Sequence, residues 1–310
     1  MTRRLLHLLT AATLLPAFTG CFTGIESTPA ITDNDLRRQN IRSTPEDSYL
    51  DDIEHAVSAA DNLSAGKRFF VTDPKIRLVL DPSASSTDIR AGDTLRLSDI
   101  SEATSVDGRK VADIRLADRT GAVFAYRTAL SPDDLLRARR ADIPFTVDLD
   151  LVEAVRRKMA GQTYFITTST RYDLNDQIFN GRRFVPVTVD AVEPGSAYYP
   201  IRLTLTDDRG AKFRLYMSVG STISMPRKFA SMFSLTDPHA RHPAITDANW
   251  ALIIEGRVAQ GMTRDECRLA MGTPANIDRQ TGYSVLREIW TYDGGRFLVF
   301  DDGILETFRL

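Results

Sequence analysis

Histidines, cysteines and paired carboxylates are the residues of this chain whose types and spacing could support chemistry. His239 and His242 stand three positions apart, and Asp237 and Asp247 are the carboxylates nearest to them. A structural zinc site needs four ligands held in a fixed geometry, and this proline-flanked loop supplies only one pair of imidazoles. The spacing therefore predicts no metal site.

Two pairs of adjacent carboxylates occur at Asp207-Asp208 and at Asp301-Asp302. Glycine follows each pair within two residues, and aspartate just before glycine is typical of a turn. The sequence carries no nucleophile elbow, phosphate-binding loop or zinc-ligand spacing. A catalytic triad can assemble from distant segments, so an enzyme is the least favoured class rather than an excluded one. We expect a protein without catalytic residues, metal or cofactor.

Cys21 follows a segment with the features of a secretory signal peptide. Two arginines begin the segment, and an apolar stretch of about 14 residues (5–18) follows them. That stretch is shorter than the roughly 20 residues that a membrane-spanning helix needs. Because the cysteine stands directly after Thr19 and Gly20, the segment resembles a bacterial lipoprotein signal.

The resemblance implies that residues 1–20 are removed and that Cys21 is the site of lipid attachment. Acyl chains anchor a protein by about 0.8 kcal/mol for each buried methylene group. The alternative is an ordinary secreted protein with a cysteine here by chance. We expect residues 21–43, which are polar, to form a flexible tether, and the protein to lie at the periplasmic face of the outer membrane.

The composition is that of an ordinary globular protein. Of 310 residues, 43% are apolar and 26% are charged, and the net charge is −2. Nothing suggests the concentrated basic face of a nucleic-acid partner. If Cys21 is lipidated, Cys267 has no disulfide partner, and its apolar neighbours indicate a small buried side chain rather than a reactive thiol.

Two parts of the chain repeat one pattern of strands and turns. Residues 66–72 (GKRFFVT) resemble residues 161–167 (GQTYFIT). Farther along, turn glycines and apolar positions match at an offset of 89 residues. The matching pairs are Gly92/Gly181, Leu95/Phe184, Ile114/Leu203, Leu116/Leu205, Asp118/Asp207, Gly121/Gly210 and Phe124/Phe213. An offset that preserves both kinds of position predicts a duplicated module.

We expect each module to be one helix followed by a small antiparallel barrel or curled sheet, similar to a bacterial SH3-like barrel. The first module would span 44–141, with its helix from Thr44 to about Ala60. The second would span 142–228, with Asp148 capping a helix that ends at Met159. A helix capped by Ser131 would join the modules, and residues 229–245, with two prolines, would be a linker.

The final segment, 246–310, carries the most specific motif. Asp247 can cap a first helix, and Thr263 and Glu266 have the spacing of a capping box at the start of a second. Gly272 and Pro274 can end that second helix. Three strand-like runs separated by Asp-Gly turns follow, so we expect two helices and then a three-stranded meander.

This segment resembles the BamE/SmpA/OmlA-like family over about a fifth of the chain. The residues that carry the resemblance are Gly256, Gly261, Met262, Thr263, Glu266, Leu269, Gly272, Thr273, Pro274, Trp290, Tyr292, Phe300 and Gly303. The family contains small outer-membrane lipoproteins that bind the barrel-assembly machine, and the same fold serves inhibitors of secreted enzymes. The resemblance thus implies a protein partner in the envelope.

The resemblance divides the motif into candidates for partner binding and residues that build the fold. The partner-binding candidates are Gly261, Met262, Thr263, Trp290 and Tyr292, and the structural residues are Glu266, Gly272, Pro274, Phe300 and Gly303. Trp290 and Tyr292 alternate along one strand face, which favours core packing over ligand binding. The Gly-Met-Thr run is also a good helix start, an alternative that stays open.

The sequence therefore predicts an α+β protein with two tandem helix-plus-small-β-barrel repeats followed by an ααβββ domain. The function that it favours is a lipid-anchored, non-catalytic interaction or scaffold module, with outer-membrane protein assembly as the implied process. The alternatives are a peptidoglycan- or glycan-binding envelope module and an inhibitor of an envelope enzyme. Exposed aromatic residues gathered on a barrel would favour glycan binding, and the candidates are Tyr172, Phe179, Tyr198 and Tyr199.

Overall fold

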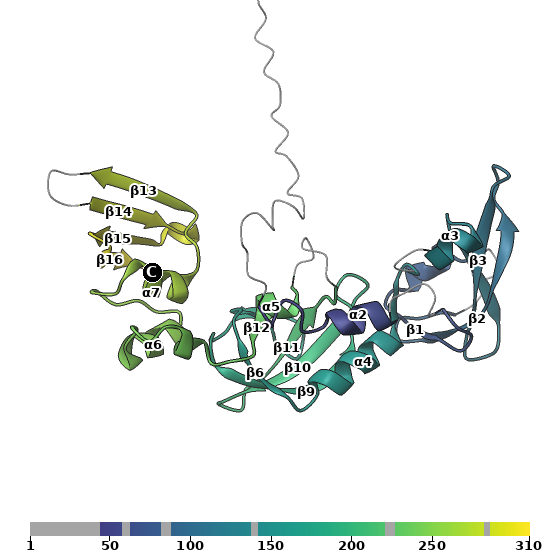
Figure 1. The fold of residues 1–310 in the computed structure, drawn as a ribbon, viewed down its shortest axis with the longest axis horizontal. Helices are drawn as coiled ribbons and strands as arrows, with labels where there is room; N and C mark the ends of the chain where they lie inside the picture. The colour runs from purple at the N-terminus through teal and green to yellow at the C-terminus, as the bar shows by residue number, and fades with distance from the viewer. Residues whose placement is uncertain (1–43, 58–62, 82–87, 138–141, 221–226, 282–285) are drawn as a thin grey trace, which may run out of the picture. The chain divides into compact units, whose positions relative to one another are not determined.

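The computed structural model describes residues 44–57, 63–81, 88–137, 142–220, 227–281 and 286–310 (Figure 1). The predicted signal peptide, Cys21 and the tether 21–43 lie outside the described residues. The described chain has a mixed α+β fold of short helices and three antiparallel sheets. Within those ranges no helix combines the length and the apolar character that crossing a bilayer requires.

The first sheet has five strands in the order β4-β3-β2-β1-β5. They are β1 (Arg68–Val71), β2 (Thr94–Thr104), β3 (Lys110–Ala117), β4 (Val123–Arg127) and β5 (Thr146–Asp148). Apolar side chains from β1 to β4 bury one core together with Leu135 of α3 (Pro132–Arg137), whereas Val147 of β5 lies in the core of the second sheet. As predicted, Ser131 caps α3, and its hydroxyl accepts the amide hydrogen of Asp134 at 3.1 Å. In the paired strands β4 and β5 are the two edges, so the pairing order is open rather than closed.

The second sheet has seven strands in the order β12-β6-β9-β10-β11-β7-β8. They are β6 (Thr163–Ile166), β7 (Thr170–Tyr172), β8 (Ile178–Asn180), β9 (Pro186–Pro194), β10 (Ile201–Asp207), β11 (Lys212–Met217) and β12 (Phe233–Ser234). Helix α4 (Leu149–Met159) has the predicted bounds, and the Asp148 side chain caps it by accepting the amide hydrogen of Asp150. Its apolar residues, including Val152 and Val155, pack into the core of this sheet.

The two sheets share one order of strands over five positions. The order β4-β3-β2-β1-β5 of the first corresponds to β11-β10-β9-β6-β12 of the second, which β7 and β8 extend beyond β11. Strands β1 and β6 have the same alternation of exposed and buried residues. The glycines that precede them, Gly66 and Gly161, both have positive φ angles. Phe124 and Phe213, a predicted matching pair, are both buried.

Two elements cross the module boundary that the sequence predicts between 141 and 142. The predicted helix from Thr44 is observed as turns followed by α2 (Asp51–Val57), and Leu50 and Ile53 pack in the core of the second sheet, not the first. Strand β5, predicted to belong to the second module, pairs with β1 of the first sheet. Each module therefore uses an element from the other's part of the sequence.

The predicted linker 229–245 contributes to the second core. Helix α5 (Phe229–Met232) and strand β12 bury Phe229, Met232 and Phe233, and β12 pairs with β6. These apolar side chains outweigh the two prolines that suggested a linker, since both prolines lie after β12. The linker interpretation is wrong for at least the first six residues of the range.

The C-terminal segment contains helices α6 (Asp247–Ile254) and α7 (Arg264–Met271), followed by a four-stranded meander. The strands are β13 (Asn276–Thr281), β14 (Leu286–Thr291), β15 (Phe297–Asp301) and β16 (Ile304–Arg309). Strand β13 is absent from the predicted three-stranded meander because its residues are mostly polar, as an edge strand allows. Thr246, rather than the predicted Asp247, caps α6 by accepting the amide hydrogen of Asn249.

Candidate functional site

The histidine pair packs against an aromatic side chain. The His239 ring stacks on Trp250 with 4.5 Å between centroids, and His242 lies 6.1 Å from the same ring. The described residues contain no cluster of three or more His, Cys, Asp or Glu side chains that could hold a metal ion. The pair therefore serves as packing around α6.

Of the two carboxylate pairs, Asp207 has the turn contacts that the sequence predicts, whereas Asp208 and Asp301 form ion pairs with Arg182 and Arg287. The Asp207 side chain accepts amide hydrogens from Arg209 at 3.0 Å and Ala211 at 2.9 Å. Asp302 accepts the amide hydrogen of Leu286 at 3.0 Å, and Asp301 binds Arg287. These carboxylates are engaged in turn and strand contacts.

The five C-terminal candidates for partner binding divide by burial. Met262, Trp290 and Tyr292 are 1%, 0% and 6% exposed, so they belong to the core of this segment. The structure thus confirms the core-packing interpretation of Trp290 and Tyr292, and it leaves Gly261 and Thr263 as the exposed members. Thr263 forms the predicted capping box with Glu266.

The structural residues of the motif lie where helix ends and turns need them. Gly272 ends α7 with a positive φ angle, Gly303 has a φ of +87° in the β15–β16 turn, and Pro274 and Phe300 are buried. Burial and the neighbouring Glu266 raise the pKa of the Cys267 thiol to about 12. Cys267 is fully buried, which agrees with the predicted structural role.

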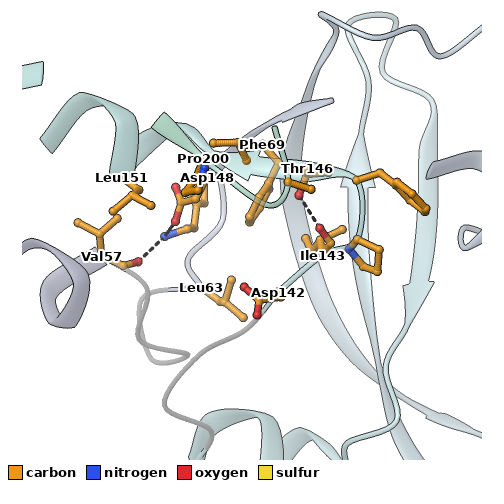
Figure 2. A pocket seen from close by; sticks show the side chains of 14 residues that line it. Val57, Leu63, Phe69, Asp142, Ile143, Thr146, Asp148, Leu151 and Pro200 are labelled. Carbon is orange, nitrogen blue, oxygen red and sulfur yellow. Dashed lines mark hydrogen bonds and ion pairs between the residues drawn. The ribbon is translucent and has the colours of Figure 1, made fainter. Parts of the chain in front are cut away.

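A cavity of about 210 Å³ lies beside β1 and β5, next to α4 (Figure 2). Lys67 is its one basic residue, and the Lys67 side chain is only 4% exposed. Its ammonium group donates to the Val57 carbonyl at 3.0 Å and lies 2.8 Å from Asp148 and 3.9 Å from Asp150. Burial raises the pKa of Asp148, although Lys67 acts in the opposite direction.

The contacts of Lys67 give this cavity a structural role. The ammonium group links the end of α2 to the start of α4 and to β5, so the ion pair holds together elements that cross between the modules. A buried ion pair of this kind is weak evidence for a binding site, because each charge already has its partner.

Tyrosine and arginine side chains gather on the solvent face of the second sheet. The alternation of β10 and β11 buries Leu203 and Leu215 and leaves Arg202, Arg214 and Tyr216 on the opposite face. Cross-strand pairing sets Arg202 opposite Tyr216, and Arg214 opposite Tyr172 of β7. We call this set the tyrosine–arginine face, and it comprises Tyr172, Tyr198, Tyr199, Arg202, Arg214, Tyr216 and Arg227.

Ring contacts connect the tyrosines through one guanidinium group. The Arg227 guanidinium lies over the rings of Tyr172 and Tyr199, at 5.1 and 5.2 Å from their centroids. Tyr172 contacts Tyr216 edge to face at 5.1 Å, and Tyr199 contacts Tyr198 in the same way at 4.9 Å. The Tyr198 side chain is 69% exposed, so at least one ring of the set is open to a ligand.

Hydrogen bonds fix the orientation of the strand residues in this face. Tyr216 donates its hydroxyl hydrogen to Asp176 at 2.7 Å, and Arg214 donates to the same carboxylate at 3.2 Å. Burial acts to raise the pKa of Asp176, but these two hydrogen bonds hold the pKa below its ordinary value. Asp176 is therefore ionised at neutral pH and orients both donors.

A tight loop between β9 and β10 presents the other two tyrosines. The Gly195 amide donates to the Pro200 carbonyl at 2.9 Å, and the Ser196 amide donates to the Tyr199 carbonyl at 2.9 Å. A Cβ atom on Gly195 would lie 2.2 Å from the Tyr199 carbonyl oxygen, so only glycine fits this turn without a shift.

Three of the four aromatic residues singled out from the sequence come together here. Phe179 of β8 does not. It lies opposite Arg171 of β7, whereas its neighbour Ile178 lies opposite Tyr172. Because successive strand residues face opposite ways, Phe179 lies on the other face of the sheet from Tyr172. The sequence analysis missed Tyr216 and the three arginines. The alternation of Arg214 and Tyr216 with buried residues on β11 could have indicated them, whereas aromatic residues taken alone do not.

Comparison of the chain with protein-family models, with curated proteins and with solved structures finds no match.

Proposed function

We propose that the chain is a lipid-anchored, non-catalytic protein of the bacterial cell envelope that binds cell-wall glycan through the tyrosine–arginine face. The observation that carries the proposal is that the Arg227 guanidinium lies over the half-buried rings of Tyr172 and Tyr199, and that the exposed Tyr198 contacts Tyr199. Aromatic rings pack against the apolar face of a pyranose, and guanidinium groups donate several hydrogen bonds to oxygen atoms of the sugar.

The lipid and the glycan site together suggest how the protein acts. The lipoprotein-like signal places the lipid on Cys21, at the periplasmic face of the outer membrane. A protein attached at one end by lipid and at the other by glycan holds the two layers near each other, and anchoring raises the effective concentration of the binding face beside the wall. This role requires no catalytic residue, metal or cofactor.

We infer further that the two sheets are tandem repeats on the SH3-like pattern, and that the second repeat carries β7 and β8 as an addition. The shared five-strand order and the matching burial of β1 and β6 support this inference. We also propose that residues 246–310 form a domain of the BamE/SmpA/OmlA-like type. The capping box and the helix, helix, meander order support it, and β13 departs from the predicted pattern.

A protein partner at the C-terminal segment is the second proposal, because β16 is an edge strand with exposed apolar side chains. Ile304, Phe308 and Leu310 are 40%, 37% and 55% exposed. Gly261, Met262 and Arg264 already bond to the start of this edge at Gly303 and Leu305, so the part of β16 that can accept a strand from another chain is 306–309. Crosslinking in intact membranes tests the partner that the family resemblance implies: barrel-assembly subunits recovered with the wild type and lost with Phe308→Asp would support it.

Co-sedimentation of the purified full chain with isolated peptidoglycan sacculi tests the glycan proposal. We expect the wild type to sediment with the sacculi and the Tyr198→Ala/Tyr199→Ala variant to remain in the supernatant. Phe179→Ala is the matched control, because it removes an exposed aromatic ring that lies outside the tyrosine–arginine face. The proposal would be contradicted if the wild type did not sediment with the sacculi, or if the Tyr198→Ala/Tyr199→Ala variant sedimented as well as Phe179→Ala does.

A further inference from the structure

We infer that the tyrosine–arginine face selects an acidic glycan, with Arg227 as the residue that binds the carboxylate of the sugar. The inference rests on the proposed function and names the chemical class of its ligand. It depends on which of the three arginines in this face has its charge compensated within the protein.

Arg202 and Arg214 each have a carboxylate partner. Arg202 lies 3.3 Å from Glu193, and Arg214 lies 3.2 Å from Asp176. These two cations are neutralised by the protein, so they contribute orientation and hydrogen bonds rather than free positive charge.

Arg227 differs from both, because no Asp or Glu lies within ion-pair distance of it among the described residues. Among the described residues, the Arg227 side chain makes one hydrogen bond, which it donates to the Tyr172 hydroxyl at 2.7 Å. The six residues before it, 221–226, lie outside the described residues, and their sequence, Ser-Thr-Ile-Ser-Met-Pro, contains no acid. Arg227 is half-buried, so its charge is partly withdrawn from water without a carboxylate in return.

The backbone at Arg227 is held in an unusual conformation. Its φ angle is +59°, a left-handed value that residues other than glycine rarely adopt. The Arg227 carbonyl accepts the Ser218 amide hydrogen at 3.1 Å, which ties the residue to the end of β11. Backbone strain of this kind concentrates at binding sites. The fold thus keeps the guanidinium over Tyr172 and Tyr199 at a cost to the backbone.

A guanidinium group placed in this way suits a carboxylate. The guanidinium carbon lies close to two ring centroids and one of its N–H hydrogens is donated to Tyr172, while its other N–H hydrogens have no acceptor among the described residues and remain for a ligand. The edge of a guanidinium matches the two oxygens of a carboxylate in a bidentate contact. A sugar ring on the exposed Tyr198 could then place a carboxylate substituent toward Arg227. Amino-sugar strands with carboxylate-bearing substituents, as in peptidoglycan, are the class that this arrangement fits.

Three soluble probes that differ in charge test the inference on the purified full chain. They are a peptidoglycan strand with free carboxylates, the same strand with its carboxylates amidated, and a neutral N-acetylglucosamine hexamer. We expect the wild type to bind the acidic strand about tenfold more tightly than the amidated one, the size of effect that one charge-assisted contact supplies. Binding is measured by titration calorimetry at fixed ionic strength.

Substitution of Arg227 then assigns that preference to one residue. In Arg227→Gln the preference for the acidic strand should disappear while affinity for the amidated strand is retained, and Arg227→Lys should keep part of the preference. Tyr198→Ala should weaken both strands alike. Thermal unfolding of each variant reports whether its fold is intact, and if Arg227→Gln does not fold, the wild-type comparison of the two strands decides alone.

The outcomes separate this inference from the proposed function. If the wild type binds acidic and amidated strands equally, the inference is overturned and glycan binding stands. If the wild type binds none of the three probes, the proposed function fails, and the inference fails with it. A preference for the acidic strand that persists in a folded Arg227→Gln would overturn the assignment to Arg227.

Discussion

The two sheets present different solvent faces on the same arrangement of strands. In the first sheet Arg127 on β4 forms a bidentate ion pair with Asp113 on β3, and both hydrogen bonds are 2.8 Å long. At the offset of 89 residues the corresponding pair in the second sheet is Tyr216 opposite Arg202. The members of the first pair bind each other, whereas in the second pair Arg202 binds Glu193 and Tyr216 binds Asp176.

The surroundings of the two pairs explain the difference. Only the second sheet has β7 and β8, which bring Tyr172 beside Tyr216. Only the second has the Gly195–Pro200 turn with its two tyrosines, where the first has a short Asp-Gly turn between β2 and β3. Matched core positions such as Phe124 and Phe213 are buried alike, although Phe184, the counterpart of Leu95, packs against the C-terminal core. The tyrosine–arginine face therefore arises mainly from additions at the edge and in one loop. We conclude that the same arrangement of strands carries an ion pair on the first sheet and the tyrosine–arginine face on the second.

Substitution of matched core residues has the largest expected effect and tests the likeness of the two cores. Phe124→Ala and Phe213→Ala each remove a buried ring and should each lower the free energy of unfolding by about 3–5 kcal/mol. Denaturant titration followed by circular dichroism measures the change. A loss below about 1 kcal/mol at one position and a full loss at the other would show that the cores are not alike.

Glu46 tests the attachment of the N-terminal segment to the second sheet rather than the first. Burial acts to raise its pKa, but hydrogen bonds from the Leu235 amide and Arg241 hold the pKa at about 2. Because the folded pKa lies below the unfolded one, ionised Glu46 stabilises the fold above about pH 4.5, and this contribution is lost as pH falls toward 2.

We therefore expect Glu46→Gln to cost on the order of 2 kcal/mol at pH 7 and much less at pH 2.5. Unfolding curves of both proteins across this range measure the difference. Asp47→Asn is the control, since Asp47 is exposed. A Glu46→Gln effect that does not change with pH would contradict the account.

Transfer of the Asp113–Arg127 ion pair to the second sheet tests whether the residues at these positions determine glycan binding. The double variant Arg202→Asp with Tyr216→Arg reproduces the Asp113–Arg127 pair at the corresponding positions. We expect glycan affinity to fall about tenfold with the fold intact, because one ring leaves the face and the arginine introduced at position 216 is paired with the new carboxylate at position 202. Sacculus co-sedimentation gives the affinity, and undiminished binding by the folded variant would remove the contrast.

Gly195→Ala has the smallest expected effect and tests the loop. The added methyl group meets the Tyr199 carbonyl, so the turn must shift and carry Tyr198 with it. We expect a few-fold loss of glycan affinity and a loss of about 1–2 kcal/mol in the free energy of unfolding, because the clash is with a backbone atom and only a shift of the turn relieves it. An unchanged affinity would mean that the loop tyrosines do not contact the ligand.

Local patterns gave reliable predictions of individual helices and of the C-terminal core. Asp148, Ser131 and the Thr263–Glu266 capping box mark helix starts through contacts between near neighbours, which the sequence displays directly. The burial of Trp290 and Tyr292 followed from alternation along one strand. Signals of this kind depend on a few adjacent residues.

The predictions that failed depend on contacts between distant segments. Helix α2 packs with the second sheet, and β5 pairs with the first. Both contacts join segments that are far apart in the sequence and belong to different repeats. Strand β13 lacks an apolar pattern, since it is an edge strand. The sequence indicated the tyrosine–arginine face only in part, because Arg227 contacts Tyr172 across 55 positions of the chain.

Hydroxyl-radical footprinting of the full chain, with and without sacculus fragments, tests most directly whether the second sheet is the glycan-binding surface. The account predicts that the tyrosines of the tyrosine–arginine face lose reactivity when glycan is added, Tyr198 most of all. Tyr126 on the first sheet should be unaffected. Protection of the first sheet or of the C-terminal segment, with Tyr198 unchanged, would contradict it.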